Sequence, residues 1–540
     1  MLVRTVPLLA AVTSATLLLF FAPPAQAAEF TDLLSAADDL DDGDPDTYNP
    51  WDFHIEPSFT FDYSTAQISR EAPCVPHDYP TADDYPEMDS EQLGDYSDFV
   101  HSNPRLISER GRCDEPTIVY NNEMMYRQLR HTLDLELRAG LYKDLELRVN
   151  FPYVINSSRG LRYHDDVDET NSSVDPATGD IRDHGEDVFD DGVDYQQERG
   201  AYASALDQYQ MYRFMELDDD FRNYDRSGMG DPSVGIHWAP WSDYRDDTKA
   251  TMVVGMDYVM PIAPIQKADN DAVGEGLHKL EWNLAASKRF DWIEPYFGAR
   301  YTLPIPATDS LYGDVHEGSG DEGAGQVVTN PPHEGMFTIG TEFIPYEDPE
   351  IGARYGVDLR FEFGYTSEGR DYTPLFDHMT ADDNHCNGKR LSDVQPSFDD
   401  QGTLENPDDV ACSWVVQQPS NTAPPEYNLR DTDANTQFQF DDLMTVDDYG
   451  TFSGMLGVYL QPTEYFQFRT TASLTHHQSH LLTNARTGRN TEHTDEDTVD
   501  MNDPRERNPA YNPAYDNSGD RFRVERFNTW QLSATLAVQF

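Results

Sequence analysis

The chain has 540 residues, with 38 Lys and Arg against 99 Asp and Glu, giving a net charge of −61. A surface this acidic repels phosphate backbones, which excludes nucleic acid as a partner. Beyond the N-terminal segment no apolar run reaches the roughly 18–20 residues of a membrane-spanning helix, which excludes a polytopic helical membrane protein.

The first segment, residues 1–27, has the features of a secretory signal peptide. Arg4 supplies the positive charge, residues 8–22 form an apolar stretch, and Ala25-Gln26-Ala27 is a small-x-small cleavage site. An uncleaved anchor is disfavoured because Pro23-Pro24 ends the apolar stretch early. We expect cleavage near Ala27, export from the cytoplasm, and an acidic N-terminal extension over residues 28–51.

From residue 52 onward, apolar and polar residues alternate with a period of two, which is typical of strands with one apolar face. A hairpin around 141–144 joins Leu133, Leu135 and Leu137 to Leu145 and Leu147. The pattern predicts twelve strands, near 52–66, 124–140, 145–155, 230–240, 249–261, 277–289, 293–305, 334–345, 352–367, 446–461, 465–479 and 524–540.

The lengths of the connections indicate how these strands are arranged. Short turns near 141–144, 241–248, 290–292, 346–351 and 462–464 alternate with long loops near 67–123, 156–229, 262–276, 306–333, 368–445 and 480–523. Short periplasmic turns and long extracellular loops are typical of outer-membrane barrels, whereas soluble sandwiches show no such rule. We therefore predict an all-β fold, a transmembrane antiparallel up-and-down barrel of about twelve strands over residues 52–540.

Aromatic residues agree with this prediction. They flank the predicted short turns, where a bilayer interface would lie, at Tyr142, Trp238, Trp241, Tyr244, Trp292, Tyr346, Tyr465 and Phe466. The chain ends on Phe540 in an alternating strand, which resembles the C-terminal signal recognised by the barrel-assembly machinery. Ordinary strand propensity is the alternative explanation for the aromatic residues.

If the apolar faces meet lipid, the opposite faces line a lumen. The candidates for selecting solutes there are Asp134, Glu136, Arg138, Glu146, Arg148, Arg300, Asp358, Arg360, Glu362 and Arg469. Two interpretations remain open, because a twelve-strand barrel lies between filled eight-strand barrels and open porins. The charges either line a polar pore or pair across strands as packing.

The four cysteines are expected to form disulfides outside the cytoplasm. Cys74 with Cys113 and Cys386 with Cys412 is the favoured pairing among three, with each bond inside one long loop. Such bonds stabilise long loops by restricting the unfolded chain.

The sequence gives little support for a catalytic site or a metal-binding site. His477 and Ser479 share one strand face, as a base and nucleophile would, but they fall on the lumen side without an orienting third residue. The acidic loop runs do not match a calcium-binding loop, and there is no phosphate loop or zinc spacing. We predict no catalytic site, metal or cofactor.

Several strand edges resemble a known family. The segments 137–147, 151–154, 228–236 and 294–301 are similar to the first hairpin and the G-x-G-D strand entry of outer-membrane transporters associated with meta-pathway phenol degradation. The resemblance extends over about the first eight strands and implies passive passage of a small, aromatic or hydrophobic solute. The long acidic loops depart from that family's pattern.

The sequence therefore favours a bacterial outer-membrane channel for small solutes, surrounded by outer-membrane lipid and inserted by the barrel-assembly machinery. The alternative is a non-conducting structural or surface-binding barrel. An outer-membrane hydrolase is a third, less favoured hypothesis. The solute and the oligomeric state do not follow from the sequence.

Overall fold

The computed structural model describes residues 53–76, 112–113, 117–141, 145–165, 167, 220–241, 248–267, 270–308, 310–312, 330–348, 351–379, 443–463, 465–485 and 521–539. In these ranges no helix is long and apolar enough to cross a membrane. The predicted signal peptide, the extension at 28–51, Cys386, Cys412 and Phe540 lie outside the described residues.

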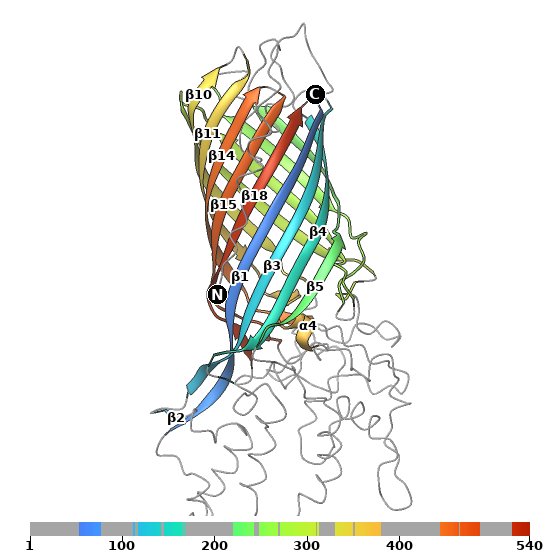
Figure 1. Cartoon of the computed structure of the whole chain (residues 1–540), viewed down its shortest axis with the longest axis vertical. Helices are drawn as coiled ribbons and strands as arrows, with labels where there is room; N and C mark the ends of the chain where they lie inside the picture. Colours follow the sequence, from blue (N-terminus) through green and yellow to red (C-terminus); the bar gives the residue numbers. More distant parts are fainter. Residues whose placement is uncertain are drawn as a thin grey trace, which may run out of the picture.

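Twelve antiparallel strands form a closed barrel, as the alternation predicts (Figure 1). Each strand pairs with its neighbours along the chain, and β1 closes the barrel by pairing with both β3 and β18. The barrel strands are β1 (Phe53–Pro76), β3 (Thr117–Gly140), β4 (Leu145–Tyr163), β6 (Ser233–Trp241), β7 (Thr251–Val259), β8 (Leu277–Ser287), β9 (Ile293–Pro306), β10 (Glu334–Asp348), β11 (Ala353–Thr366), β14 (Tyr449–Thr463), β15 (Phe466–His477) and β18 (Phe527–Gln539).

The two ends of the barrel differ. The end at which β18 finishes carries the short connections and is called the inner end; the opposite end, which carries the long connections, is called the outer end (Figure 1). The remaining elements belong to the long connections or continue barrel strands toward the outer end. They are β2 (Arg112–Cys113), β5 (Arg222–Met229), β12 (Gly369–Asp371), α4 (Phe376–Met379), β13 (Met444–Val446), β16 (His480–Leu481) and β17 (Phe522–Val524).

Several strands extend further into the predicted loops than alternation indicates. β1 continues to Pro76 and β4 to Tyr163, and β5 lies inside the predicted loop 156–229. The predicted boundaries near 67, 123, 156 and 229 are therefore corrected. Ile68, Met124 and Leu161 explain the difference, because these apolar side chains near the outer end are completely buried inside the barrel. They break the rule that apolar residues face outward.

Exposed apolar side chains cover the outer surface of every barrel strand. Examples, one from each strand in the order given above, are Phe59, Leu133, Phe151, Ile236, Val254, Trp282, Phe297, Phe337, Leu359, Leu456, Phe468 and Leu532, each between 37% and 52% exposed. A soluble monomer rarely exposes a continuous apolar surface of this extent. Closure pairs each of the twelve barrel strands with a neighbour on both sides, so this surface suits a hydrocarbon environment.

One wall of the barrel is interrupted. The inner part of β4 pairs with β6 and its outer part with β5, so β5 and β6 together occupy one strand position. Gly228, next to the last residue of β5, has φ +147°, which side chains disfavour, and a Cβ on Gly230, between β5 and β6, would lie 3.1 Å from Pro152. Asp231 accepts hydrogen bonds from the N–H groups of Ala263 (2.9 Å) and Glu275 (3.2 Å). The G-x-G-D segment thus breaks the strand and anchors the connection after β7.

Replacing Asp231 with Ala is expected to destabilise the barrel by about 1–3 kcal/mol, because two backbone donors lose a carboxylate acceptor. The urea midpoint of the protein in lipid micelles measures this loss. Asp225→Ala, at an exposed position of β5, is the control and should leave the midpoint unchanged. Equal midpoints for Asp231→Ala and the unmodified protein would contradict the anchoring role.

Candidate functional site

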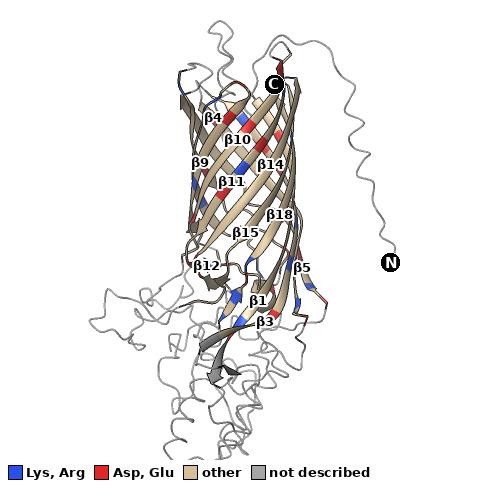
Figure 2. Ribbon diagram, turned by 90° about the vertical axis from the view of Figure 1, so that its left-hand side faces the viewer, with Lys and Arg blue, Asp and Glu red and all other residues tan. Residues whose placement is uncertain are grey.

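All ten predicted lumen residues are described, and each lies between outward-facing neighbours on its strand. Leu135, Leu359, Phe361 and Phe468, for example, are exposed on the outer face and flank Glu136, Arg360 and Arg469. Figure 2 shows the charged residues of the barrel interspersed with uncharged ones, many of them toward the inner end. The structure brings five of the ten into two groups at the inner end, and Glu146, Arg148 and Glu362 lie next to these groups.

The first group, the seam network, consists of Glu56, Glu136, Arg138 and Arg469 and spans the strands where the barrel closes. Glu56 accepts hydrogen bonds from Arg138 (Nη2 to Oε2, 3.3 Å) and from Arg469. Arg138 also donates from Nε to Glu136, at 2.5 Å. Glu56, Arg138 and Arg469 are each about 5% exposed or less. Arg469 on β15 reaches past β18 to Glu56 on β1, so the network joins strands that are not adjacent.

Next to the seam network, Glu146 and Arg148 form an ion pair on β4. Glu146 is completely buried, while the Arg148 side chain is 12% exposed. His237 on β6 and Asn283 on β8 both contact the carboxylate of Asp257 on β7, at 3.1 and 2.7 Å. Polar pairing therefore continues around this side of the inner end.

The second group, the β9–β11 network, consists of Glu294, Glu342, Arg354, Asp358 and Arg360. The Asp358 carboxylate accepts hydrogen bonds from three groups: the hydroxyls of Tyr296 (2.7 Å) and Tyr459 (3.3 Å), and the guanidinium of Arg360 (3.3 Å). Arg360 also contacts Glu362, at 3.8 Å.

Within the same network, Arg354 lies between two buried carboxylates. Its Nη2 atom is 3.7 Å from Glu294 and 4.0 Å from Glu342. Glu294 also accepts a hydrogen bond from Ser287 (2.6 Å). Glu342 is 1% exposed, and neither of its carboxylate oxygens has a hydrogen-bond partner in the described part of the chain.

The predicted site lacks two members of the β9–β11 network, Glu294 and Arg354, and the two tyrosines that donate to Asp358, Tyr296 and Tyr459. Glu294 and Tyr296 share a strand face with Arg300, so continuing the two-residue period toward the short turn would have found them. Arg354 lies on the same face as Asp358 and Arg360 by the same rule. The hydroxyl contact of Tyr459 with Asp358 depends on the register between the neighbouring strands β11 and β14, which no local pattern gives.

The middle of the lumen is more open. Arg300 and Gln531 face inward by strand parity, yet both are exposed, so solvent reaches them inside the barrel. Arg300 has no ion pair among the described residues. The inward faces of β14, β15 and β18 carry small hydroxyl side chains that pair with one another, such as Ser453 with Thr475 (2.7 Å) and Thr471 with Ser533 (2.6 Å). Small side chains on this wall leave room for water.

At the outer end, residues 369–379 fold inward and form a cap. Leu375 and Phe376 are completely buried. Leu375 belongs to an apolar cluster with strand residues that include Ile68, Met124, Leu161 and Phe522.

A buried ion pair holds this cap to the barrel. Arg226 on β5 pairs with Asp377 on α4, and each is 3% exposed. Arg226 also donates to the carbonyls of Lys267, Asn270 and Ala272, at 2.7 to 3.1 Å. His378 packs edge-on against Tyr224, and burial lowers the pKa of His378 to about 4, which keeps its ring neutral at neutral pH.

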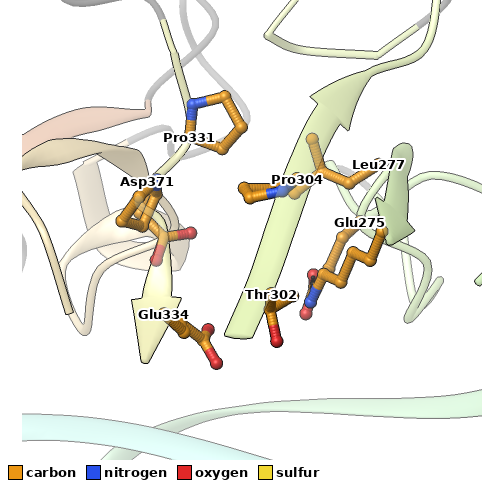
Figure 3. A pocket seen from close by; sticks show the side chains of 9 residues that line it. Glu275, Leu277, Thr302, Pro304, Pro331, Glu334 and Asp371 are labelled. Atoms are coloured by element: carbon orange, nitrogen blue, oxygen red, sulfur yellow. Dashed lines mark ion pairs between the residues drawn. The ribbon is translucent and has the colours of Figure 1, made fainter. Parts of the chain in front are cut away.

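A small polar cavity of about 60 Å³ lies between the cap and the wall formed by β8, β9 and β10. Lys279 pairs there with Glu275 (2.6 Å), and Asp371 accepts a hydrogen bond from Tyr312 (3.0 Å). Burial, reinforced by Glu275, raises the pKa of Asp371 to about 6. Figure 3 shows the lining side chains of Glu275, Leu277, Lys279, Thr302, Pro304, Pro331, Pro332, Glu334 and Asp371.

Other predicted residues have different outcomes. In β1 and β2, Pro76 is paired with Cys113, which brings the backbones of Cys74 and Cys113 into one small sheet; the disulfides themselves stay predictions.

His477 contacts Thr529 (3.2 Å) and stacks on Phe527 (4.3 Å between ring centroids). Ser479 lies beyond the end of β15. In the described ranges, no group of three or more His, Cys, Asp or Glu side chains is arranged to hold a metal ion.

No family model and no curated protein sequence matches the chain. Among solved structures, it is similar to the COG4313 outer membrane channel from Pseudomonas putida F1 (10% identity, TM-score 0.32, 92% of this chain and 99% of that one). It is also similar to a Pseudomonas aeruginosa FadL homologue (9%, 0.27, 96% and 96%) and to the Pseudomonas putida toluene transporter TodX (7%, 0.26, 96% and 96%). At TM-scores below 0.5, no function transfers from these proteins to this chain.

Proposed function

We propose that the protein is a bacterial outer-membrane channel for the passive passage of small solutes. One observation carries this proposal: Arg300 and Gln531 are exposed although they face the inside of a closed barrel. Exposed polar side chains there require water in the lumen, and a hydrated lumen is the first requirement of a diffusion channel. The seam and β9–β11 networks would narrow this lumen at the inner end.

The outer surface supports a membrane location. Apolar side chains are exposed on all twelve strands, and Trp238, Trp241 and Trp292 are at least half exposed near the inner end, as in an interfacial girdle. Outer-membrane lipid and the barrel-assembly machinery are the partners that this surface implies. Export would require cleavage of the signal peptide near Ala27.

The side chains that line the lumen indicate which class of solute would pass through it. Its inner end presents carboxylates, guanidiniums and tyrosine hydroxyls, so a small polar or charged solute gains contacts there that an apolar one lacks. Among the solutes that the resemblance implies, an apolar aromatic compound therefore fits this lumen least. A polar aromatic compound remains a suitable substrate to test.

Single-channel recording in planar bilayers tests the proposal. Discrete conductance steps are expected from the purified mature protein, with an ion selectivity that changes in Arg138→Ala and Arg360→Ala, because each substitution removes a charge from the inner end. Vesicles loaded with a polar or an apolar aromatic compound then compare the two solute classes. A folded barrel that inserts but stays silent would contradict the channel.

The second candidate is a non-conducting structural or surface-binding barrel. The observation in its favour is that side chains are buried at both ends of the lumen, by ion pairs at the inner end and by the cap at the outer end. The same recording separates the two candidates, since only the second predicts silence in every variant.

A further inference from the structure

Two neighbouring arginines that face the lumen, Arg130 on β3 and Arg159 on β4, have no partner in the described part of the chain. Neither forms an ion pair or a hydrogen bond there, and the Nε atom of each is buried without an acceptor. Both side chains are otherwise partly exposed, so water in the lumen reaches their free N–H groups. By contrast, a carboxylate pairs with each of the inward-facing arginines Arg138, Arg148, Arg226, Arg354, Arg360 and Arg469.

The two arginines lie close together on adjacent strands. In the pairing of β3 with β4, Arg130 is opposite Ser157 and Arg159 is opposite Gln128, so the two side chains are diagonal neighbours on the inward face. The seam network lies further along β3 toward the inner end, and Leu161, on the same face of β4 as Arg159, belongs to the apolar cluster of the cap. A solute in the lumen below the cap therefore meets both guanidiniums together.

The carboxylates near this pair do not take its N–H groups. Asp62 is opposite Arg130 in the pairing of β1 with β3, but it accepts a hydrogen bond from Gln531 (2.9 Å) instead. Asp134 shares the inward face of β3 with Arg130 and forms no ion pair with it in the residues described. Glu275, which lies within electrostatic range of both arginines, is paired with a lysine (2.6 Å). These carboxylates weaken the positive field of the pair, yet they leave its N–H donors free.

The chemistry of the guanidinium indicates which ligand suits these donors. A guanidinium presents parallel N–H groups that match the two oxygens of a carboxylate, and hydrogen bonds between two such charged groups are about twice as strong as neutral ones. An acceptor at the buried Nε atoms would also remove the cost of leaving a donor unsatisfied. A carboxylate fits better than a phosphate, because a second negative charge on the ligand would be repelled by Asp62 and Asp134.

We propose that Arg130 and Arg159 form a binding site in the lumen for the carboxylate of a small organic anion. This inference rests on the proposed channel function and deepens it by naming the chemical class of the solute. The bound solute occupies the lumen below the cap, so it hinders the passage of ions for as long as it stays.

Single-channel recording with benzoate tests this site, and benzamide, which has a similar planar shape without the charge, is the matched probe. Benzoate should interrupt the KCl current in a concentration-dependent way, and benzamide should not. In the double variant Arg130→Gln/Arg159→Gln, the half-blocking concentration of benzoate should rise about tenfold, the effect of losing a charge-assisted hydrogen bond. Inorganic phosphate should block less tightly than benzoate. Neither substitution breaks an ion pair between described residues, so the variant should fold and still conduct KCl.

Arg127→Gln is the matched control. Arg127 is on the same strand as Arg130 and loses the same charge, but it lies on the outer face against the ring of Phe221 (4.1 Å), so the half-blocking concentration should not change. A conducting channel that benzoate does not block, or blocks equally in the double variant, would overturn the inference while leaving the channel intact. Equal block by benzamide, or tighter block by phosphate, would also overturn it. Complete silence of the unmodified protein would instead overturn the proposed function.

Discussion

Replacing Glu56 with Gln is expected to destabilise the folded barrel by about 3–5 kcal/mol, the usual cost of breaking a buried ion pair from one side. Glu56 is 5% exposed and accepts hydrogen bonds from Arg138 and Arg469, which are buried to a similar degree. Gln keeps the shape but not the charge, so two buried guanidiniums lose their shared carboxylate. Urea unfolding in lipid micelles, followed by tryptophan fluorescence, measures the loss.

Glu136→Gln provides the matched comparison. Glu136 also pairs with Arg138, but its side chain is 29% exposed, and in that variant Arg138 keeps its contact with Glu56. We expect a cost of about 1 kcal/mol or less, as for partly exposed pairs. If both variants lost the same free energy, the distinction between a bridging carboxylate and a peripheral one would be wrong.

The other large effect is expected at the outer end, where Arg226→Met should release the cap. The substitution leaves Asp377 buried without its cation and removes the donors for three backbone carbonyls, at a cost of about 3–5 kcal/mol. Because this ion pair joins α4 to β5 and does not involve the other barrel strands, we expect local rather than global opening. Hydrogen exchange should therefore accelerate at 369–379 and stay slow in β14 and β15.

Arg127→Met is the control for this prediction. Arg127 lies on the outer face of β3, where it contacts Asn223 (3.0 Å) and the ring of Phe221. Removing it should leave exchange in the cap unchanged. Slow exchange at 369–379 in Arg226→Met would show that the apolar contacts of Leu375 and Phe376 hold the cap without the ion pair.

The barrel could be predicted from the sequence because its lipid-facing surface imposes a period of two. Leu456, Val458 and Leu460 alternate with Gly457 and Tyr459, and the structure places them outside and inside a strand as expected. β5 was not predicted, since Tyr224 and Arg226 face inward on a segment without outward leucines or valines. Its contacts are with the cap and the connection after β7, and neither creates alternation.

The candidate site could be predicted only in part, for a related reason. Parity predicts which side chains face the lumen. Which of them meet depends on strand order and on the stagger between strands, which alternation does not give. The pairing of Glu56 with Arg469, 413 residues apart in the chain, follows from closure of the barrel. The partners of Arg354 depend in the same way on how β9, β10 and β11 are aligned.

That long-range pair has a consequence for biogenesis. β1 is synthesised before the other barrel strands, whereas its partner β18 is the last of them. One edge of β1 therefore stays unpaired until the whole barrel region has been synthesised. Glu56 and Arg469 meet across β18, so their contact forms only once that strand is in place. Until then both groups stay hydrated, and insertion of the last strand desolvates them together. An assembly intermediate that lacks β18 would therefore expose unpaired strand edges, together with the unpaired charges of Glu56 and Arg469, to lipid. Insertion of the last strand removes both at once.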